Sequence, residues 1–91
     1  MKIRTVLSIK VIRPQQEDWN YGEITCETTV TLEYLIIRIL EVKKLQHLRG
    51  NVVRVLYNEV DILPQISATL SDIGIPAGLE VTKNIELYLS Q

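Results

Sequence analysis

Apolar and polar residues alternate at the start of the chain. Over residues 3–12 the odd positions are mainly apolar, and the apolar ones are Ile3, Leu7, Ile9 and Val11. Period-two alternation is typical of a strand with one buried face. A polar run that starts at Pro14 ends this strand, and a second alternation follows around Ile24 and Cys26. The two runs predict an antiparallel hairpin with a connection longer than a tight turn.

A helical periodicity replaces the alternation near residue 30. Apolar residues recur every three or four positions and would share one face of a helix: Leu32, Leu35, Ile36, Ile39 and Val42. Threonine hydroxyls at positions 28, 29 and 31 are available to cap its start. Gly50 is a natural stop, and basic residues gather before it, as the helix dipole favours: Lys43, Lys44, His47 and Arg49. We predict one main helix over about residues 30–47.

A third strand is predicted after the helix. Residues 52–57 are rich in β-branched and aromatic side chains, which favour strands. Alternation would place Val53, Val55 and Tyr57 on one face and Val52, Arg54 and Leu56 on the other. Residues 58–67 include Pro64 and have mixed polarity, so we expect a loop there with a short strand at most.

Towards the end of the chain, the sequence predicts a helical turn near residues 70–73. Apolar and polar residues then alternate again over residues 85–89, which predicts a closing strand. An alternative start for this strand stays open. Leu79 and Val81 would then begin it, and residues 82–84 would form a bulge or an extension.

Composition and charge narrow the class of protein. Ninety-one residues hold one core, so we expect a single domain over residues 1–91. The net charge of −1 argues against nucleic-acid binding and against a polybasic membrane-binding surface. One cysteine allows no intrachain disulfide, and the N-terminus lacks the apolar stretch of a signal peptide. We therefore expect no membrane association and a cytoplasmic or nuclear location.

The predicted order is hairpin, helix, strand, irregular stretch, helical turn and strand. One helix can then cover one face of a mixed sheet of four to five strands, the α+β arrangement called the β-grasp. Within this fold, Leu70-Ser71-Asp72-Ile73-Gly74-Ile75 resembles the ubiquitin-like family's leucine-serine-aspartate-aromatic-x-isoleucine turn. Arg54-Val55-Leu56-Tyr57 resembles the family's third strand, and Gly78 matches a glycine that often precedes the last strand.

The resemblance implies roles for particular residues. Leu70 and Ile75 would pack beneath the sheet, and Asp72 would cap the turn. Conjugated family members and the related sulfur carriers end in a flexible tail closing with two glycines, which must thread a narrow enzyme channel. This sequence closes with Tyr88-Leu89-Ser90-Gln91, so we expect a non-conjugating type.

Few residues are suited to catalysis. A nucleophile, a base and an orienting group must be in contact, whereas Cys26 is predicted inside a strand and His47 near a helix end. We expect Cys26 to be an inert buried thiol and His47 a solvated cap. Glu59 and Asp61 flank Val60 without matching a calcium loop, so a solvated loop is expected there. We predict no enzymatic activity, no metal site and no cofactor.

A binding role requires a surface with exposed apolar residues. The sheet face away from the helix would carry candidates from three strands: Val6, Lys10, Arg54, Leu56 and Tyr88. In the ubiquitin-like family the outer face of the third and last strands is the common partner-binding patch. The resemblance matches Leu56 to its central isoleucine and Arg54 to the neighbouring arginine. Trp19, in the hairpin loop, is a second candidate that either anchors a partner or covers the core.

We therefore predict a non-catalytic protein-interaction module of the kind often found within larger proteins. Two alternatives stay open. Ras-association domains share the superfold, pair their second strand with a small GTPase and favour basic residues on the first two strands. Lys2, Arg4, Lys10 and Arg13 suit that class, whereas Glu23 and Glu27 do not. Alternatively, Tyr34 and Ile37 on the outer side of the helix would join a second subunit in an oligomer.

Overall fold

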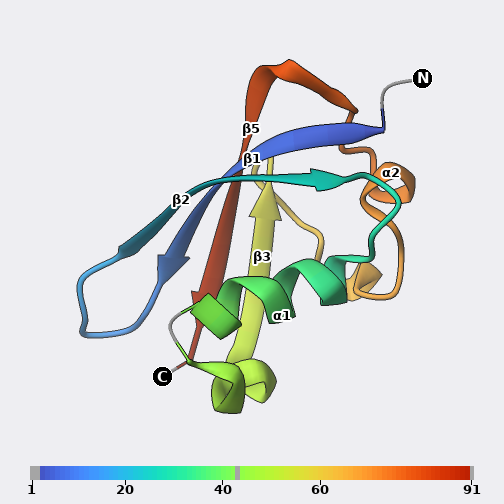
Figure 1. Cartoon of the computed structure of the whole chain (residues 1–91). Coiled ribbons are helices and arrows are strands. Elements are labelled where there is room, and N and C mark those ends of the chain that lie inside the picture. Colours follow the sequence, from blue (N-terminus) through green and yellow to red (C-terminus); the bar gives the residue numbers. More distant parts are fainter. Residues whose placement is uncertain (1–2, 43, 91) are drawn as a thin grey trace.

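A five-stranded mixed sheet with one main helix against one of its faces makes up the protein (Figure 1). The structure is a computed structural model that describes residues 3–42 and 44–90. The elements are β1 (Arg4–Ile12), β2 (Trp19–Glu27), α1 (Leu32–Val42), β3 (Val52–Tyr57), β4 (Val60–Asp61), α2 (Leu70–Ile73) and β5 (Gly78–Leu89), with 3-10 turns at Gln46–Asn51 and Leu63–Gln65. This arrangement confirms the predicted α+β β-grasp fold.

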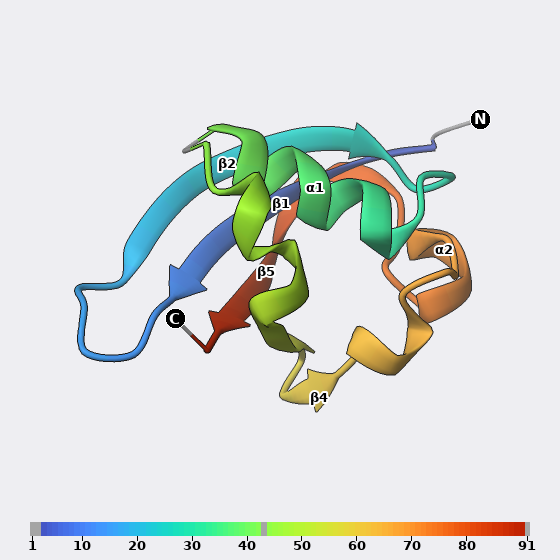
Figure 2. The same ribbon diagram turned by 90° about the horizontal axis from the view of Figure 1, so that it is seen from below.

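The strands lie in the order β2-β1-β5-β3-β4. β1 and β5 run parallel in the middle, and every other neighbouring pair is antiparallel. Seen from below, α1 crosses one face of the sheet (Figure 2). None of the helices within residues 3–42 and 44–90 is long and apolar enough to cross a membrane.

The core lies between α1 and the inward-facing residues of the three central strands. These strand residues are Leu7, Ile9, Val11, Val55, Ile85, Leu87 and Leu89, all of them buried. Each buried aliphatic side chain stabilises the fold by roughly 1.5–3 kcal/mol relative to exposure. On the helix, the predicted buried face is right for Leu32, Leu35, Ile36 and Ile39 but wrong for Val42, which is 59% exposed. Leu40 is buried in its place.

The α-helix is shorter than predicted because a C-terminal cap ends it at Val42. The backbone N–H of Leu45 donates to the Leu40 carbonyl at 2.9 Å, and that of Lys44 donates to the Glu41 carbonyl at 3.0 Å. This hydrogen-bond pair is the Schellman motif, in which the residue before the last donor is left-handed. Lys44 takes that conformation, with φ of 56°.

The predicted cap at the other end of α1 is confirmed for Thr31, whose Oγ1 accepts the backbone N–H of Tyr34 at 3.1 Å. Of the basic residues expected at the helix end, His47 and Arg49 lie in the following 3-10 turn. Lys43, like Lys2, lies outside the described residues.

Two irregularities shift residues relative to simple alternation. The first is in β3, where the register against β5 shifts between Val52 and Arg54. Val52 and Val55 are both buried while Val53 is 53% exposed, so the predicted faces of Val52 and Val53 were exchanged. Because Val53 is an extra residue in the strand, Val52 and Val55 can both reach the core.

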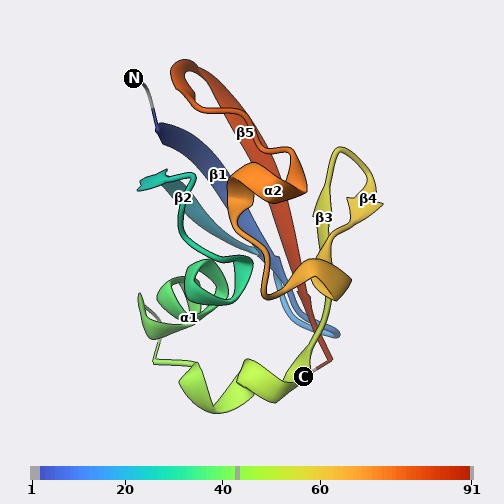
Figure 3. The same ribbon diagram turned by 90° about the vertical axis from the view of Figure 1, so that its right-hand side faces the viewer.

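The second irregularity opens β5. Thr5 pairs with Gly78 but Val6 pairs with Thr82, so residues 79–81 loop out of the strand (Figure 3). The strand therefore begins upstream of residue 85, as in the alternative reading. The bulge predicted at residues 82–84 is wrong, because those residues pair regularly with β1 and the extra residues come before them. Gly78 has φ of 128°, and the Lys83 ammonium donates to the Gly78 carbonyl at 2.8 Å, which holds the two ends of the bulge together.

The helical turn at α2 is close to its prediction. Leu70 and Ile75 are buried, as the resemblance implied. The implied role of Asp72 needs correction, because the capping acceptor is Thr69, whose Oγ1 accepts the Asp72 backbone N–H at 3.1 Å. Gly74 closes the turn with φ of 109°, a conformation that glycine adopts at little cost.

Lys44→Gly should raise the free energy of unfolding by about 0.5–1 kcal/mol, because a left-handed lysine is strained and glycine at this position is not. Chemical denaturation measures the change. Lys44→Ala keeps the Cβ strain and is the control, for which we expect little gain. Equal stabilisation by both substitutions would contradict the cap geometry.

Thr5→Val should also stabilise the fold. The Thr5 side chain is fully buried in β1, and its Oγ1 finds no hydrogen-bond partner among the described residues. Replacing a buried hydroxyl without a partner by a methyl group removes a desolvation cost of about 1 kcal/mol. Thr5→Ser keeps the hydroxyl, loses the methyl group and should destabilise. A lower melting temperature for Thr5→Val than for wild type would show that the hydroxyl is satisfied.

Candidate functional site

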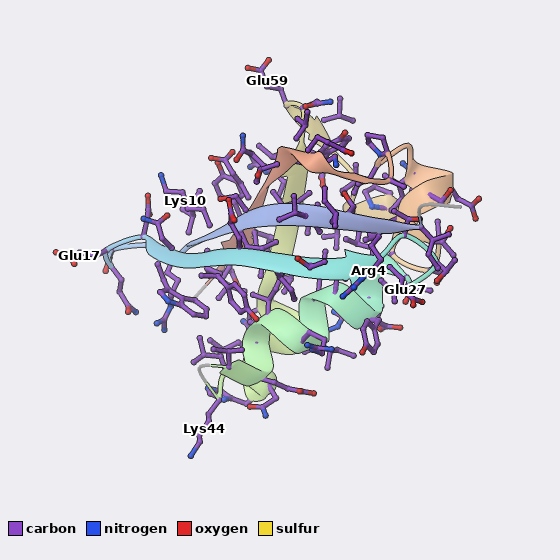
Figure 4. The ribbon with its side chains drawn as sticks, turned by 45° about the horizontal axis from the view of Figure 1, so that its top comes forward. Arg4, Lys10, Glu17, Glu27, Lys44 and Glu59 are labelled. Carbon is purple, nitrogen blue, oxygen red and sulfur yellow. The ribbon has the colours of Figure 1, made fainter. Side chains whose placement is uncertain are left out.

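The sheet face away from α1, here called the open face, gathers most of the candidate residues. The register of the three central strands aligns Ile12, Tyr88 and Arg54 in one row across the sheet. In the next row on the same face, two residues away along each strand, the register aligns Lys10, Glu86 and Leu56. In Figure 4 the labelled side chains of Lys10 and Glu59 extend from the side of the strands opposite the helix. The predicted grouping of Lys10, Arg54, Leu56 and Tyr88 is therefore present.

Arg54 and Tyr88 contact each other on the open face. The Arg54 guanidinium lies 5.2 Å from the centroid of the Tyr88 ring, within the range of a cation–π contact. The Tyr88 hydroxyl donates to the Glu86 carboxylate at 3.4 Å. An arginine that contacts a ring in this way uses the face of its guanidinium, and its N–H groups can still donate to an acceptor from outside.

Val6 and Trp19 lie away from this group. Val6 is on the open face but pairs with Thr82, four residues along β1 from Lys10 and so about 13 Å away. Trp19 pairs with Val11, whose side chain faces the core, and packs edge-on against Tyr21 at 5.5 Å. Half-buried and packed against the hydrophobic core, Trp19 has the position of a lid.

Two open-face residues were not among the predicted site residues. Ile12 breaks the alternation of β1 as an apolar residue at an even position, and the register places it beside Tyr88. Glu59 lies in the turn between β3 and β4, where Asn58 and Glu59 have φ of 52° and 65°. The broken alternation was a usable signal for Ile12, whereas nothing in the sequence pattern places Glu59 over the open face.

The two acidic residues that flank Val60, Glu59 and Asp61, have different surroundings in the structure. The Asp61 carboxylate accepts the backbone N–H groups of Val55 at 3.2 Å and Leu63 at 3.0 Å. It therefore holds β3 against the loop that follows β4. Glu59 has no such structural contact among residues 3–42 and 44–90, and its side chain extends into solvent (Figure 4).

Cys26 and His47 lie on separate elements, as expected. Cys26 is half-buried on β2, and His47 is exposed in the 3-10 turn after α1. Burial raises the pKa of the Cys26 thiol above its usual value, and the positive charge of Arg38 opposes this rise. A thiol with a raised pKa is a poor nucleophile at neutral pH.

Alkylation of Cys26 by iodoacetamide should therefore reach its half-maximal rate at a higher pH in the folded protein than in the urea-unfolded chain. Only the thiolate reacts, and burial disfavours it. Arg38→Gln should move the midpoint further upward, because it removes the positive charge that favours the thiolate. A folded-state midpoint below that of the unfolded chain would contradict this assignment.

Known proteins resemble this chain in structure. No protein-family model matches the sequence, and no curated protein matches it. A ubiquitin of Caldiarchaeum subterraneum superposes with a TM-score of 0.63 at 15% identity, covering 94% of this chain and 95% of its own. A ubiquitin-like domain of an Arabidopsis thaliana protein gives 0.60 at 16% identity, covering 96% and 80%. A de novo protein designed on ubiquitin gives 0.55 at 21% identity, covering 90% and 85%. These likenesses show that the chain has a ubiquitin-like β-grasp fold.

Proposed function

We propose that this chain is a non-catalytic, non-conjugating interaction module that binds a partner protein through the open face of its sheet. The observation that carries the proposal is the cluster of Leu56, Tyr88, Arg54 and Ile12 on neighbouring strands. We place its action in the cytoplasm or nucleus, because a small domain with one half-buried thiol needs no oxidising compartment.

The composition of the cluster supports a binding role. Tyrosine and arginine are enriched among residues that dominate binding energy, and here they are stacked on each other beside aliphatic side chains. Leu56, Tyr88 and Ile12 are each partly exposed, so a partner would remove further apolar surface from water. Stacking also lowers the entropy that Arg54 would lose on binding.

The double variant Leu56→Ala/Arg54→Ala should lose partner proteins captured from a lysate of the source cells, because it removes the aliphatic centre and the stacked cation together. Its melting temperature should change little, since neither side chain belongs to the buried core. Captured proteins are identified by mass spectrometry against the wild-type bait.

A matched control replaces an aliphatic residue and an arginine on the outer side of α1, as Ile37→Ala/Arg38→Ala. This control should retain the captured proteins. If the open-face variant captures the same proteins as wild type, the proposal is wrong. If only the helix variant loses them, binding belongs to the helix surface around Tyr34 and Ile37.

A Ras-association role is the second candidate, and the observation that favours it is the free edge of β2. β2 is the outermost strand on its side, and within residues 3–42 and 44–90 it pairs only with β1. The Thr28 N–H donates to the Ile3 carbonyl, so alternation of hydrogen-bonded pairs leaves the backbone groups of Glu23, Thr25 and Glu27 facing outward. Those two glutamates would repel an acidic GTPase surface, which ranks this role lower. GTP-dependent capture of a small GTPase would reverse the ranking.

A further inference from the structure

A hollow in the open face lies beside the Leu56 cluster. Its floor is formed by Ser8 and Asn84, which are paired on β1 and β5 and have short side chains. Six further residues border the hollow: Lys10, Asn20, Leu56, Asn58, Glu59 and Glu86. The hollow measures about 500 Å³, within the range of pockets that take small ligands, about 300–1,000 Å³.

The walls of this hollow carry an excess of negative charge. Glu86 of β5 and Glu59 of the β3–β4 turn both line the hollow, so acidic residues from two elements border it. Glu23 of β2 lies opposite Ser8 but does not line the hollow, and its carboxylate accepts the Thr82 hydroxyl at 3.4 Å. Lys10 is the cation of the rim, and its ammonium is 3.4 Å from the Asp18 carboxylate, which offsets its charge.

The chemistry of the remaining wall suits a long basic side chain. Leu56 offers an apolar surface to an alkyl stem, while the amide of Asn84 and the hydroxyl of Ser8 offer hydrogen-bond acceptors at the floor. A guanidinium or ammonium group at the end of the stem would then lie next to the acidic residues Glu86 and Glu59. An apolar partner side chain would leave those polar groups unsatisfied.

We propose that the hollow receives an arginine or lysine side chain of the partner that binds the open face. This inference rests on the proposed function and specifies the chemistry of the partner. Arg54 pairs with Tyr88, which is four residues along β5 from Asn84. The row that contains Arg54 is therefore about 13 Å from the row that contains Asn84. The partner segment therefore carries charges of both signs, with a basic residue in the hollow and an acidic residue against Arg54.

N-acetyl-arginine methylamide is the probe, with the citrulline analogue as its uncharged counterpart of nearly the same shape. Titration into the isotope-labelled protein, followed by NMR, should give saturable shifts at Ser8, Asn84 and Glu86. The citrulline analogue should bind at least several-fold more weakly. Equal shifts from both compounds, or shifts only at residues outside the hollow, would overturn the proposal.

Glu59→Gly and a matched glycine control separate charge from backbone effects. Both Glu59 and Lys44 are non-glycine residues with positive φ, so glycine should raise the melting temperature at either position. Glu59→Gly should weaken binding of the arginine probe several-fold, and Glu86→Gln should do the same without changing the backbone. Lys44→Gly, far from the hollow, should bind the probe as wild type does. Unchanged binding in both glutamate variants would overturn the proposal.

Partner capture distinguishes this inference from the function on which it rests. If Leu56→Ala/Arg54→Ala loses the captured proteins but Glu86→Gln and Glu59→Gly retain them, the open face binds a partner and the basic-residue inference falls. If all three variants lose the captured proteins, the proposed function and the basic-residue inference both stand. If Leu56→Ala/Arg54→Ala retains them, the proposed function itself fails, whatever the probe does.

Discussion

The parallel pairing of β1 with β5 is the contact on which the rest of the structure depends. It joins the first and last strands at the centre of the sheet, and both strands supply core residues on one side and open-face residues on the other. A slip of one residue would turn Leu87 to solvent and Tyr88 and Glu86 toward α1. The buried series Ile85, Leu87 and Leu89 opposes such a slip, and the same register that seals the core sets the composition of the open face.

The bulge at residues 79–81 protects this register. The segment between α2 and the central part of β5 has three more residues than the pairing with β1 can use, and the strand loops them outward. Lys83 makes the loop self-contained, because its buried ammonium bonds the Gly78 carbonyl where the strand departs from β1. Leu79 and Val81 are 55% and 67% exposed as a result, so apolar sequence here did not mean a buried strand. The free energy of keeping Ile85 to Leu89 in place exceeds the cost of that exposure.

Periodicity predicted the elements that bury one face and failed where the chain departs from regular geometry. The helix face from Leu32 to Ile39 and the strand β3 followed from spacing alone, because burial selects those positions. The helix end did not, since Lys44 adopts a left-handed conformation that sequence patterns associate with glycine, and Gly50 was the more prominent signal. The extra residue at Val53 was equally hard to predict, because either of the two consecutive valines, Val52 and Val53, could have faced the core. Arg54 and Leu56 were still assigned correctly, because both lie beyond the shift.

The open face owes its distinctive chemistry to these irregularities. The bulge at Val53 lets Val52 and Val55 both be buried while Arg54 stays beside Tyr88. The left-handed turn at Asn58 and Glu59 places an acidic residue beside β3, whose own outward residues include no acid. The left-handed turn carries a conformational cost that the core does not require, and such costs persist where a side chain is retained for another reason. The regular pattern thus specifies a β-grasp sheet, and the departures from it specify which side chains the open face presents.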